Sequence, residues 1–274
     1  MESLYHYTDL NAVVSIFQSL KLRATSIQYL NDSEEYRNGF ELFSKALRDS
    51  LTLPPNKNFG CYSSYEGALQ FLNTYVAEDM DMWCSLREFF FVTSFSRSPD
   101  QLSQWRGYGP YCLEFNESAL KEHMKLYSCI YEDEQKKASV RAEVDSAASE
   151  ITMKAESDEV ESIHWNIGYE MLRAPTIYKH SGFIEEAEVR AVFMCESDVK
   201  RDNVLYRIKG DILIPYVEVP ISAQCIKSIT VGPMKNQELA AASLQNLVEG
   251  WKRRNLPINS SCQVHLSRIP YRAH

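Results

Sequence analysis

The sequence lacks the features that mark membrane-spanning, secreted or nucleic-acid-coating chains. Its 274 residues contain no run near the ~18 consecutive apolar residues that a membrane span requires. The N-terminus passes straight into a strand-like segment, without the basic and apolar regions of a signal peptide. The formal net charge of −8 opposes non-specific binding to phosphate backbones, so there is no strong nucleic-acid signal. We therefore expect a cytoplasmic protein with no membrane partner.

The cysteines and the common catalytic motifs are equally uninformative. The seven cysteines are odd in number and scattered, with no C-x-x-C pair and no Cys/His cluster. Those in apolar runs, such as Cys112 and Cys225, are interpreted as small buried hydrophobic residues. There is no P-loop, no G-x-G-x-x-G after a strand, no H-E-x-x-H and no G-x-S-x-G. Kinase, Rossmann, zincin and α/β-hydrolase functions therefore lose their support.

The order of the expected elements favours one α+β domain over residues 1–274, without a linker. Strands are expected at 4–7, 89–95, 111–115, from about 188, and at 203–208, 212–219, 225–231 and 262–268. Helices are expected after Thr8 and Asp32 as N-terminal caps, and at 65–80, 117–127, 133–173 and 236–252. Residues 27–30 are expected to be extended and 53–63 to form a loop. The charged segment 133–173 is interpreted as a solvated helical insertion.

An acidic segment before a late apolar run is one candidate site. On a strand, Glu186, Glu188 and Arg190 would share one face, because they alternate with apolar residues. Two carboxylates about 7 Å apart are suited to acid/base work or to holding a sugar hydroxyl. The alternative is an edge strand with a solvated polar face, on which Arg190 relieves the repulsion between the two glutamates.

The connection between two expected core strands is a second candidate. The segment LSQWRGYG (102–109) places Trp105, Arg106 and Tyr108 around two glycines that permit close backbone approach. An arginine there can bind a phosphate or carboxylate in a forked geometry, and the aromatic rings can stack on a ligand. The alternative is a packed corner in which Trp105 fills the core and Arg106 pairs with an acid.

His6, near the end of the first expected strand, is a third candidate. Its imidazole can donate a hydrogen bond to a ligand or titrate near neutral pH. The alternative is a histidine whose hydrogen bonds are satisfied within the scaffold.

Seven segments, in order over nearly the whole chain, resemble the bacterial family catalogued as domain of unknown function 2971. They are LYHYT (4–8), YLNDSEE (29–35), SFS (94–96), LSQWRGYG (102–109), KHSGFIEEAEVR (179–190), ITVGP (229–233) and SRIPYR (267–272). This resemblance names a family without an established activity. Val189 stands where that family usually carries Trp, which leaves the charge pattern intact but removes a possible stacking residue.

The chain also resembles the ADP-ribosyltransferase superfamily, whose mixed, split β-sheet core binds NAD in a cleft. In that superfamily a His or Arg on an early strand holds a ribose, a Ser/Thr triplet ends a later strand, and a Glu pair opens another. His6, Ser94-Phe95-Ser96 and Glu186-Ala187-Glu188 occur here in the same order. The resemblance implies a transferase that uses NAD as a substrate, without a metal, and passes ADP-ribose to an unknown macromolecular acceptor or to water.

The ADP-ribosyltransferase resemblance also implies roles for individual residues. Glu188, with Glu186 and His6, would be catalytic, and Glu188 would stabilise the oxocarbenium-like charge as nicotinamide leaves. The implied dinucleotide-binding residues are His6, Tyr7, Ser94, Ser96, Trp105, Arg106, Tyr108, Lys179 and Arg190.

Two other functions stay open on the sequence. One is a non-catalytic nucleotide- or protein-binding module of a bacterial stress or phage-defence system. The other is a hydrolase or nuclease that holds a divalent metal with Glu186, Glu188 and Asp32, since oxygen ligands suit Mg²⁺.

Overall fold

A computed structural model gives the fold and describes residues 2–30, 33–50, 64–72, 90–154, 171–195, 199–253, 259 and 261–270. The expected helix cap at Asp32, the expected loop at 53–63 and the second half of the expected helix at 65–80 lie outside these residues.

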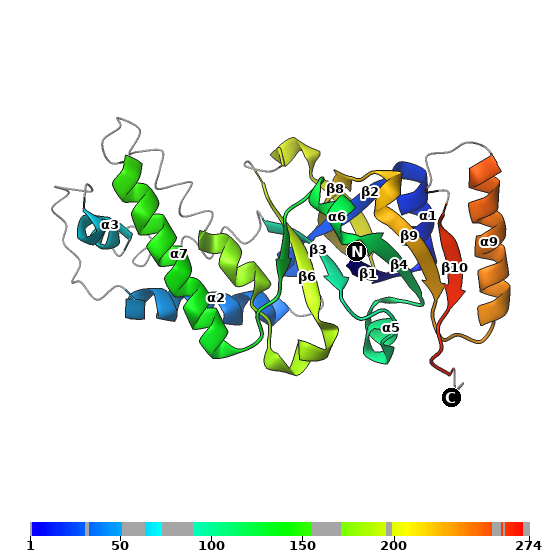
Figure 1. The fold of residues 1–274 in the computed structure, drawn as a ribbon, viewed down its shortest axis with the longest axis horizontal. Coiled ribbons are helices and arrows are strands. Elements are labelled where there is room, and N and C mark those ends of the chain that lie inside the picture. The colour runs from blue at the N-terminus through cyan, green and yellow to red at the C-terminus, as the bar shows by residue number, and fades with distance from the viewer. Residues whose placement is uncertain are drawn as a thin grey trace.

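The core is a large mixed sheet, as expected for an α+β protein (Figure 1). Its strands are β1 (Ser3–Thr8), β2 (Lys21–Ser26), β3 (Phe90–Ser96), β4 (Tyr111–Asn116), β5 (Leu126–Ser128), β6 (Glu188–Met194), β7 (Leu205–Lys209), β8 (Ile212–Pro220), β9 (Ile226–Val231) and β10 (Gln263–Leu266). They follow the order β10-β9-β4-β1-β3-β2-β8-β7, and β6 pairs with β3 and β5. The pair β9–β10 is parallel and the other pairs are antiparallel.

The sheet is split beside β3, because β1 and β2 both pair with the same edge of that strand. β6 covers one edge of β3 along its whole length, from Phe90 to Ser96. β1 and β2 must therefore both lie on the other edge: β1 pairs at Tyr5–Ser96 and β2 at Thr25–Val92. Since no pairing joins β1 to β2, the two strands diverge from β3 in opposite directions along its length.

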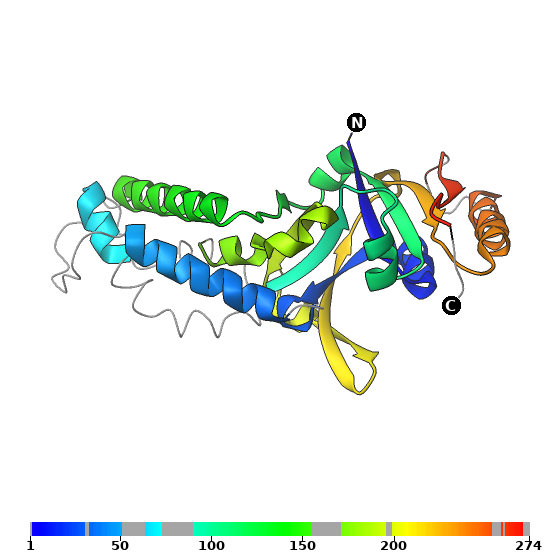
Figure 2. The ribbon, with the colours of Figure 1, turned by 90° about the horizontal axis from the view of Figure 1, so that it is seen from below.

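The helices lie on both sides of this sheet and beyond it. They are α1 (Leu10–Ser19), α2 (Ser33–Ser50), α3 (Tyr65–Leu72), α5 (Leu102–Tyr108), α6 (Glu117–Lys121), α7 (Asp133–Lys154) and α9 (Gln237–Arg253). α1 and α9 pack on the β4–β9 half of the sheet, where Phe17 stacks on Trp251 with ring centroids 5.1 Å apart. Helices α2, α3 and α7 extend away from the sheet and share a second apolar core (Figures 1 and 2).

Several local predictions are wrong at their boundaries. Asp9, not Thr8, caps α1: its carboxylate accepts a hydrogen bond from the Ala12 amide at 2.8 Å, because Thr8 still belongs to β1. Residues 27–29 form a 3₁₀ turn instead of extended chain, and the extended segment is β2 just before it. The helix expected over 117–127 ends at Lys121, since the chain then pairs as β5 with β6.

Candidate functional site

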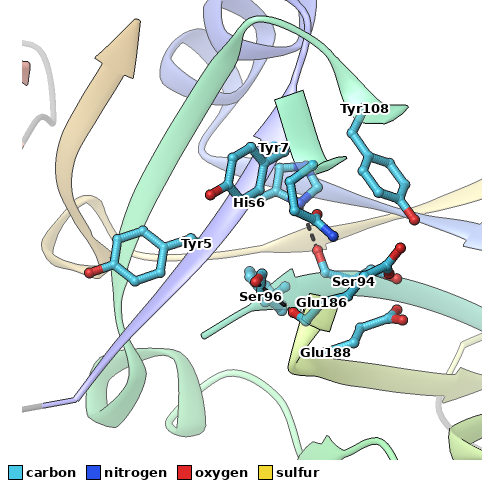
Figure 3. Close-up of a pocket in the computed structure, with 10 residues that line it drawn as sticks. Tyr5, His6, Tyr7, Ser94, Ser96, Tyr108, Glu186 and Glu188 are labelled. Carbon is cyan, nitrogen blue, oxygen red and sulfur yellow. Dashed lines mark hydrogen bonds between the residues drawn. The ribbon is translucent and has the colours of Figure 1, made fainter. Parts of the chain in front are cut away.

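A cavity of about 570 Å³ lies where β1 and β2 separate on the edge of β3. Its wall includes the end of β1, the start of α1, the outward residues of β2 and the middle of β3. A smaller pocket of about 50 Å³ adjoins it and is drawn in Figure 3. Residues that line both hollows are His6, Tyr7, Ser94, Tyr108, Glu186 and Glu188. Side chains from the first strand, the central strand and the late acidic segment thus meet in one place.

Two carboxylates and two cations form a buried cluster on the cavity wall. The Lys179 ammonium contacts the Glu186 carboxylate and lies 2.6 Å from Glu188 Oε2. Arg190 Nε donates to Glu188 Oε1 at 2.7 Å, and its Nη1 donates to the Thr176 carbonyl at 2.6 Å. The side chains of Lys179, Glu188 and Arg190 are each no more than 6% exposed. Each charge is therefore compensated inside the protein instead of by water.

The cations decide the ionisation of Glu188. Burial by itself would raise the pKa of this carboxyl, but the attraction of Arg190 and Lys179 and their hydrogen bonds outweigh it and lower the pKa to about 2. Glu188 is therefore a carboxylate at neutral pH, fixed in place before any ligand arrives.

The register of β3 and β6 explains which residues meet there. Glu188 pairs with Ser96 and Arg190 with Ser94, so these four residues come from two facing strand ends. Glu186 is not on the strand, contrary to the prediction: it ends a 3₁₀ turn, and Ala187 then adopts a left-handed conformation (φ 42°) before β6 begins. Its carboxylate still reaches the cluster through Lys179.

The edge-strand alternative for this segment is wrong. β6 lies between β3 and β5, and Glu188 and Arg190 are buried and ion-paired instead of solvated. A further hydrogen bond runs from the Glu188 amide to the Tyr131 hydroxyl at 2.8 Å, a contact that the sequence did not indicate.

His6 faces the cavity from β1 and has a defined tautomer when neutral. Its Nδ1 lies 2.9 Å from the Ser94 carbonyl oxygen. Because a carbonyl only accepts, Nδ1 carries the proton and Nε2 is left as an acceptor. Burial lowers the pKa of His6 below 6.5, and the bond to Ser94 opposes this only in part. A ligand hydroxyl is therefore a suitable donor to His6.

Tyr108 closes the small pocket from α5. In Figure 3 its hydroxyl points toward the carboxylates of Glu186 and Glu188. Burial, with the charge of Glu186, raises the pKa of Tyr108 to about 12, so the phenol stays protonated and can donate. Tyr7 lines the same pocket with its ring, while its hydroxyl donates to the Ser98 carbonyl at 2.7 Å.

Trp105 and Arg106 do not line either hollow. Trp105 is buried: its Nε1 donates to Asp100 at 2.7 Å, and its ring packs edge-on against Tyr7 at 4.6 Å. Arg106 is exposed on the other side of the same helix. The packed-corner alternative thus describes Trp105. Of the three predicted side chains of this loop only Tyr108 lines the cavity, and the neighbouring Gly107 lines it too.

Ser96 and Gly109 are structural in this geometry. The Ser96 hydroxyl donates to the Glu186 carbonyl at 2.6 Å and accepts from the Ser98 amide, which fixes the turn before β6. Gly109 has a φ of 130°, and a Cβ there would lie 2.5 Å from the Thr8 carbonyl oxygen. The close backbone approach at this glycine is to β1.

Four further cations line the larger cavity, and the sequence did not indicate them. They are Lys21, Arg23, Arg207 and Lys209. The sequence LYRIK (205–209) shows that Arg207 and Lys209 alternate with apolar residues. It does not show which strand pairs with this one, and that pairing is what brings the two side chains to the cavity.

A metal ion has no prepared place in the cluster. Within the described ranges, no group of three or more His, Cys, Asp or Glu side chains is arranged to hold one. The Lys179 ammonium sits between Glu186 and Glu188, the two carboxylates of the metal hypothesis, and its third proposed ligand, Asp32, lies outside the described residues.

Fold and site together define a mixed α/β protein with a buried carboxylate–cation cluster on a cavity wall. The family described as "Protein of unknown function (DUF2971)" has a model that matches residues 104–191, from α5 into β6. This match supports the first resemblance and includes Tyr108, Lys179, Glu186, Glu188 and Arg190. No curated protein and no solved structure matches the chain significantly. None of the described helices has the length and apolar character needed to cross a membrane.

Proposed function

We propose that the cavity binds NAD or a closely similar dinucleotide, and that the protein cleaves it at the nicotinamide glycosidic bond. ADP-ribose would then pass to a macromolecular acceptor or to water. The observation that carries the proposal is the meeting of His6, Glu186 and Glu188 in one hollow, although they are far apart in the chain. Its volume of about 570 Å³ is within the usual range of ligand pockets, ~300–1,000 Å³.

The chemistry needs a negative charge near the anomeric carbon. As the bond from ribose C1′ to nicotinamide breaks, the electron pair leaves with the nicotinamide nitrogen, which loses its positive charge. Positive charge then develops on C1′ and the ring oxygen. Glu188 is a buried, pre-ordered carboxylate, which is the kind of group that stabilises such charge without reorganisation. His6 Nε2 would accept a hydrogen bond from a ribose hydroxyl, since Nδ1 is engaged by the Ser94 carbonyl.

Glu186 suits the proton transfer that completes the reaction. Both oxygens of Glu188 already accept hydrogen bonds from Arg190 or Lys179. Of the two Glu186 oxygens, only Oε2 has a partner in the described part of the chain, and that partner is Lys179. The Glu186 side chain lines both hollows. When an acceptor oxygen bonds to C1′, its proton would pass to Glu186.

The test is nicotinamide release from NAD by wild type, Glu186→Gln and Glu188→Gln, followed by chromatography, with NAD binding measured by calorimetry. We expect each substitution to slow release by about 100-fold or more. Glu117→Gln is the matched control, because Glu117 is a buried, ion-paired carboxylate outside the cavity. Absence of both NAD binding and nicotinamide release, with any candidate acceptor, would refute the proposal.

A binding module without catalysis is the second candidate. It is favoured by the full engagement of Glu188 by Lys179 and Arg190, which leaves that carboxylate little capacity to respond to a substrate. Tight nucleotide binding without turnover, unaffected by Glu188→Gln, would favour this function over the transferase.

A further inference from the structure

Part of the cavity wall is a positively charged face of three paired strands, β2, β8 and β7. Arg23 on β2 pairs with Glu218 on β8, and on β7 Arg207 pairs with Ile214 and Lys209 with Ile212. Side chains alternate between faces along a strand and paired residues share a face, so these positions all lie on one side of the sheet. Both β2 and β7 therefore direct cations to the same cavity.

The β7–β8 hairpin has two different faces. It projects from the body of the molecule, as the yellow hairpin in Figure 2 shows. The residues that alternate with the cations, Tyr206 and Ile208, are 62% and 80% exposed and do not line the cavity. Arg207 and Lys209 are thus on the face of β7 that lines the cavity, and Tyr206 and Ile208 are on the other face.

These cations have little compensation from acids. Lys21 is paired with Glu218 at 2.6 Å. Arg23 has its guanidinium 5.0 Å above the ring of Tyr216, and within the described ranges no carboxylate forms an ion pair with it. Arg207 is similarly unpaired among these residues, and its Nε is buried without a hydrogen-bond partner.

The cavity lining has an excess of positive charge, although the whole chain is negatively charged. Six lysines and arginines line the cavity, against three aspartates and glutamates, in a chain with a net charge of −8. Lys179 and Arg190 are neutralised by Glu186 and Glu188. The excess positive charge therefore belongs to the β2–β7 wall.

We propose that Arg23, Arg207 and Lys209 form a subsite for a diphosphate group of a nucleotide. Two guanidinium forks and an ammonium on one wall match a group with several anionic oxygens better than a single carboxylate. The nucleotide identity of the ligand rests on the proposed function, since the carboxylate cluster in the same cavity would hold the ribose. The diphosphate subsite itself requires no cleavage.

The experiment is calorimetric binding of ADP, inorganic diphosphate and adenosine to the full chain at low ionic strength. The variants are Arg207→Ala, Arg207→Lys and Arg207→Ala/Lys209→Ala, with Arg253→Ala on α9 as the matched control outside the cavity. Circular dichroism melting of each variant shows whether it folds.

Wild type should bind ADP and diphosphate, with a Kd for adenosine at least tenfold weaker than that for ADP. Arg207→Ala should raise the Kd for ADP about tenfold, Arg207→Lys less, and Arg253→Ala not at all. Equal affinity for ADP and adenosine, no binding of any phosphate probe, or a folded double variant with unchanged Kd would overturn the subsite. ADP binding that depends on Arg207, without nicotinamide release from NAD, would keep the subsite and reject the transferase.

Discussion

Lys179 lies 2.6 Å from Glu188 inside the protein, and both side chains are almost fully shielded from solvent. A buried ion pair of this kind offers little net stability compared with apolar residues, but removing one partner leaves an uncompensated charge. Lys179 also contacts Glu186, and both glutamates line the cavity. A substitution in the Lys179–Glu188 ion pair should therefore change both the stability of the fold and the charge of the cavity.

The first prediction concerns the acid stability of the Glu188 cluster. The folded-state pKa of Glu188, about 2, is below the ordinary 4.5, so its stabilising contribution is complete above about pH 4.5 and is lost as the pH falls toward 2. Glu188→Gln should cost about 3 kcal/mol at pH 7, and this difference should shrink on acidification. Urea unfolding followed by circular dichroism between pH 7 and 3 measures it.

Glu117→Gln provides the comparison for that experiment. Hydrogen bonds from Arg97 outweigh the opposing effect of burial and, together with the contact with Lys121, lower the pKa of Glu117 to about 2. Its stability difference should have the same pH dependence, while nucleotide binding should be unaffected. A Glu188→Gln difference that stays constant from pH 7 to 3 would contradict the ion-pair account.

The second prediction separates the two glycines of the 102–109 connection. Gly109→Ala should destabilise the fold by about 2 kcal/mol or more, because φ is 130° and a Cβ would lie 2.5 Å from the Thr8 carbonyl oxygen. Gly107→Ala should be neutral or stabilising by up to ~1 kcal/mol, since nothing lies within 4 Å and the residue is helical. Thermal unfolding of the two variants decides it, and equal effects would count against this geometry.

The third prediction concerns the protonation of His6. Because burial lowers its pKa below 6.5, the imidazole should stay neutral above that pH and gain its proton only in more acidic solution. Its contribution to stability should be complete above pH 6.5 and decline below it, as the unfolded chain takes up the proton first. An NMR titration of the His6 ring, assigned with His6→Gln, should give a midpoint under 6.5. A midpoint at or above 6.5 would contradict burial as the dominant effect on the pKa of His6.

The fourth prediction compares two neighbours on α5. Arg106→Ala should leave the Kd for ADP within about twofold of wild type, since Arg106 is exposed and outside the cavity. Tyr108→Ala should weaken binding roughly tenfold, because its ring lines the cavity and its hydroxyl faces the carboxylates. Calorimetry with ADP distinguishes the two. A large effect of Arg106→Ala would mean that α5 turns when ligand binds.

Local pattern was enough to predict much of the framework. The continuous apolar run before Ser96 predicted β3, and the change from a glycine-containing loop to alternating residues predicted that β6 begins at Glu188. These elements depend on side-chain period and on residues that are near in sequence. The same pattern correctly placed Glu188 and Arg190 on one strand face.

The sequence by itself therefore determined most of the strands (though not β2), the α+β character of the fold and the residue types available to the site. Only the tertiary structure decided which of them meet: His6 and Glu188 do, Arg106 does not, and Arg207 joins them from an unexpected strand. The physical reason is that pairing and register depend on contacts between distant segments, whereas helical and strand periods are local. The local sequence around Arg106 and Arg207 does not show which of them reaches the cavity. The packing of the sheet leaves Arg106 in solvent and brings Arg207 to the cavity.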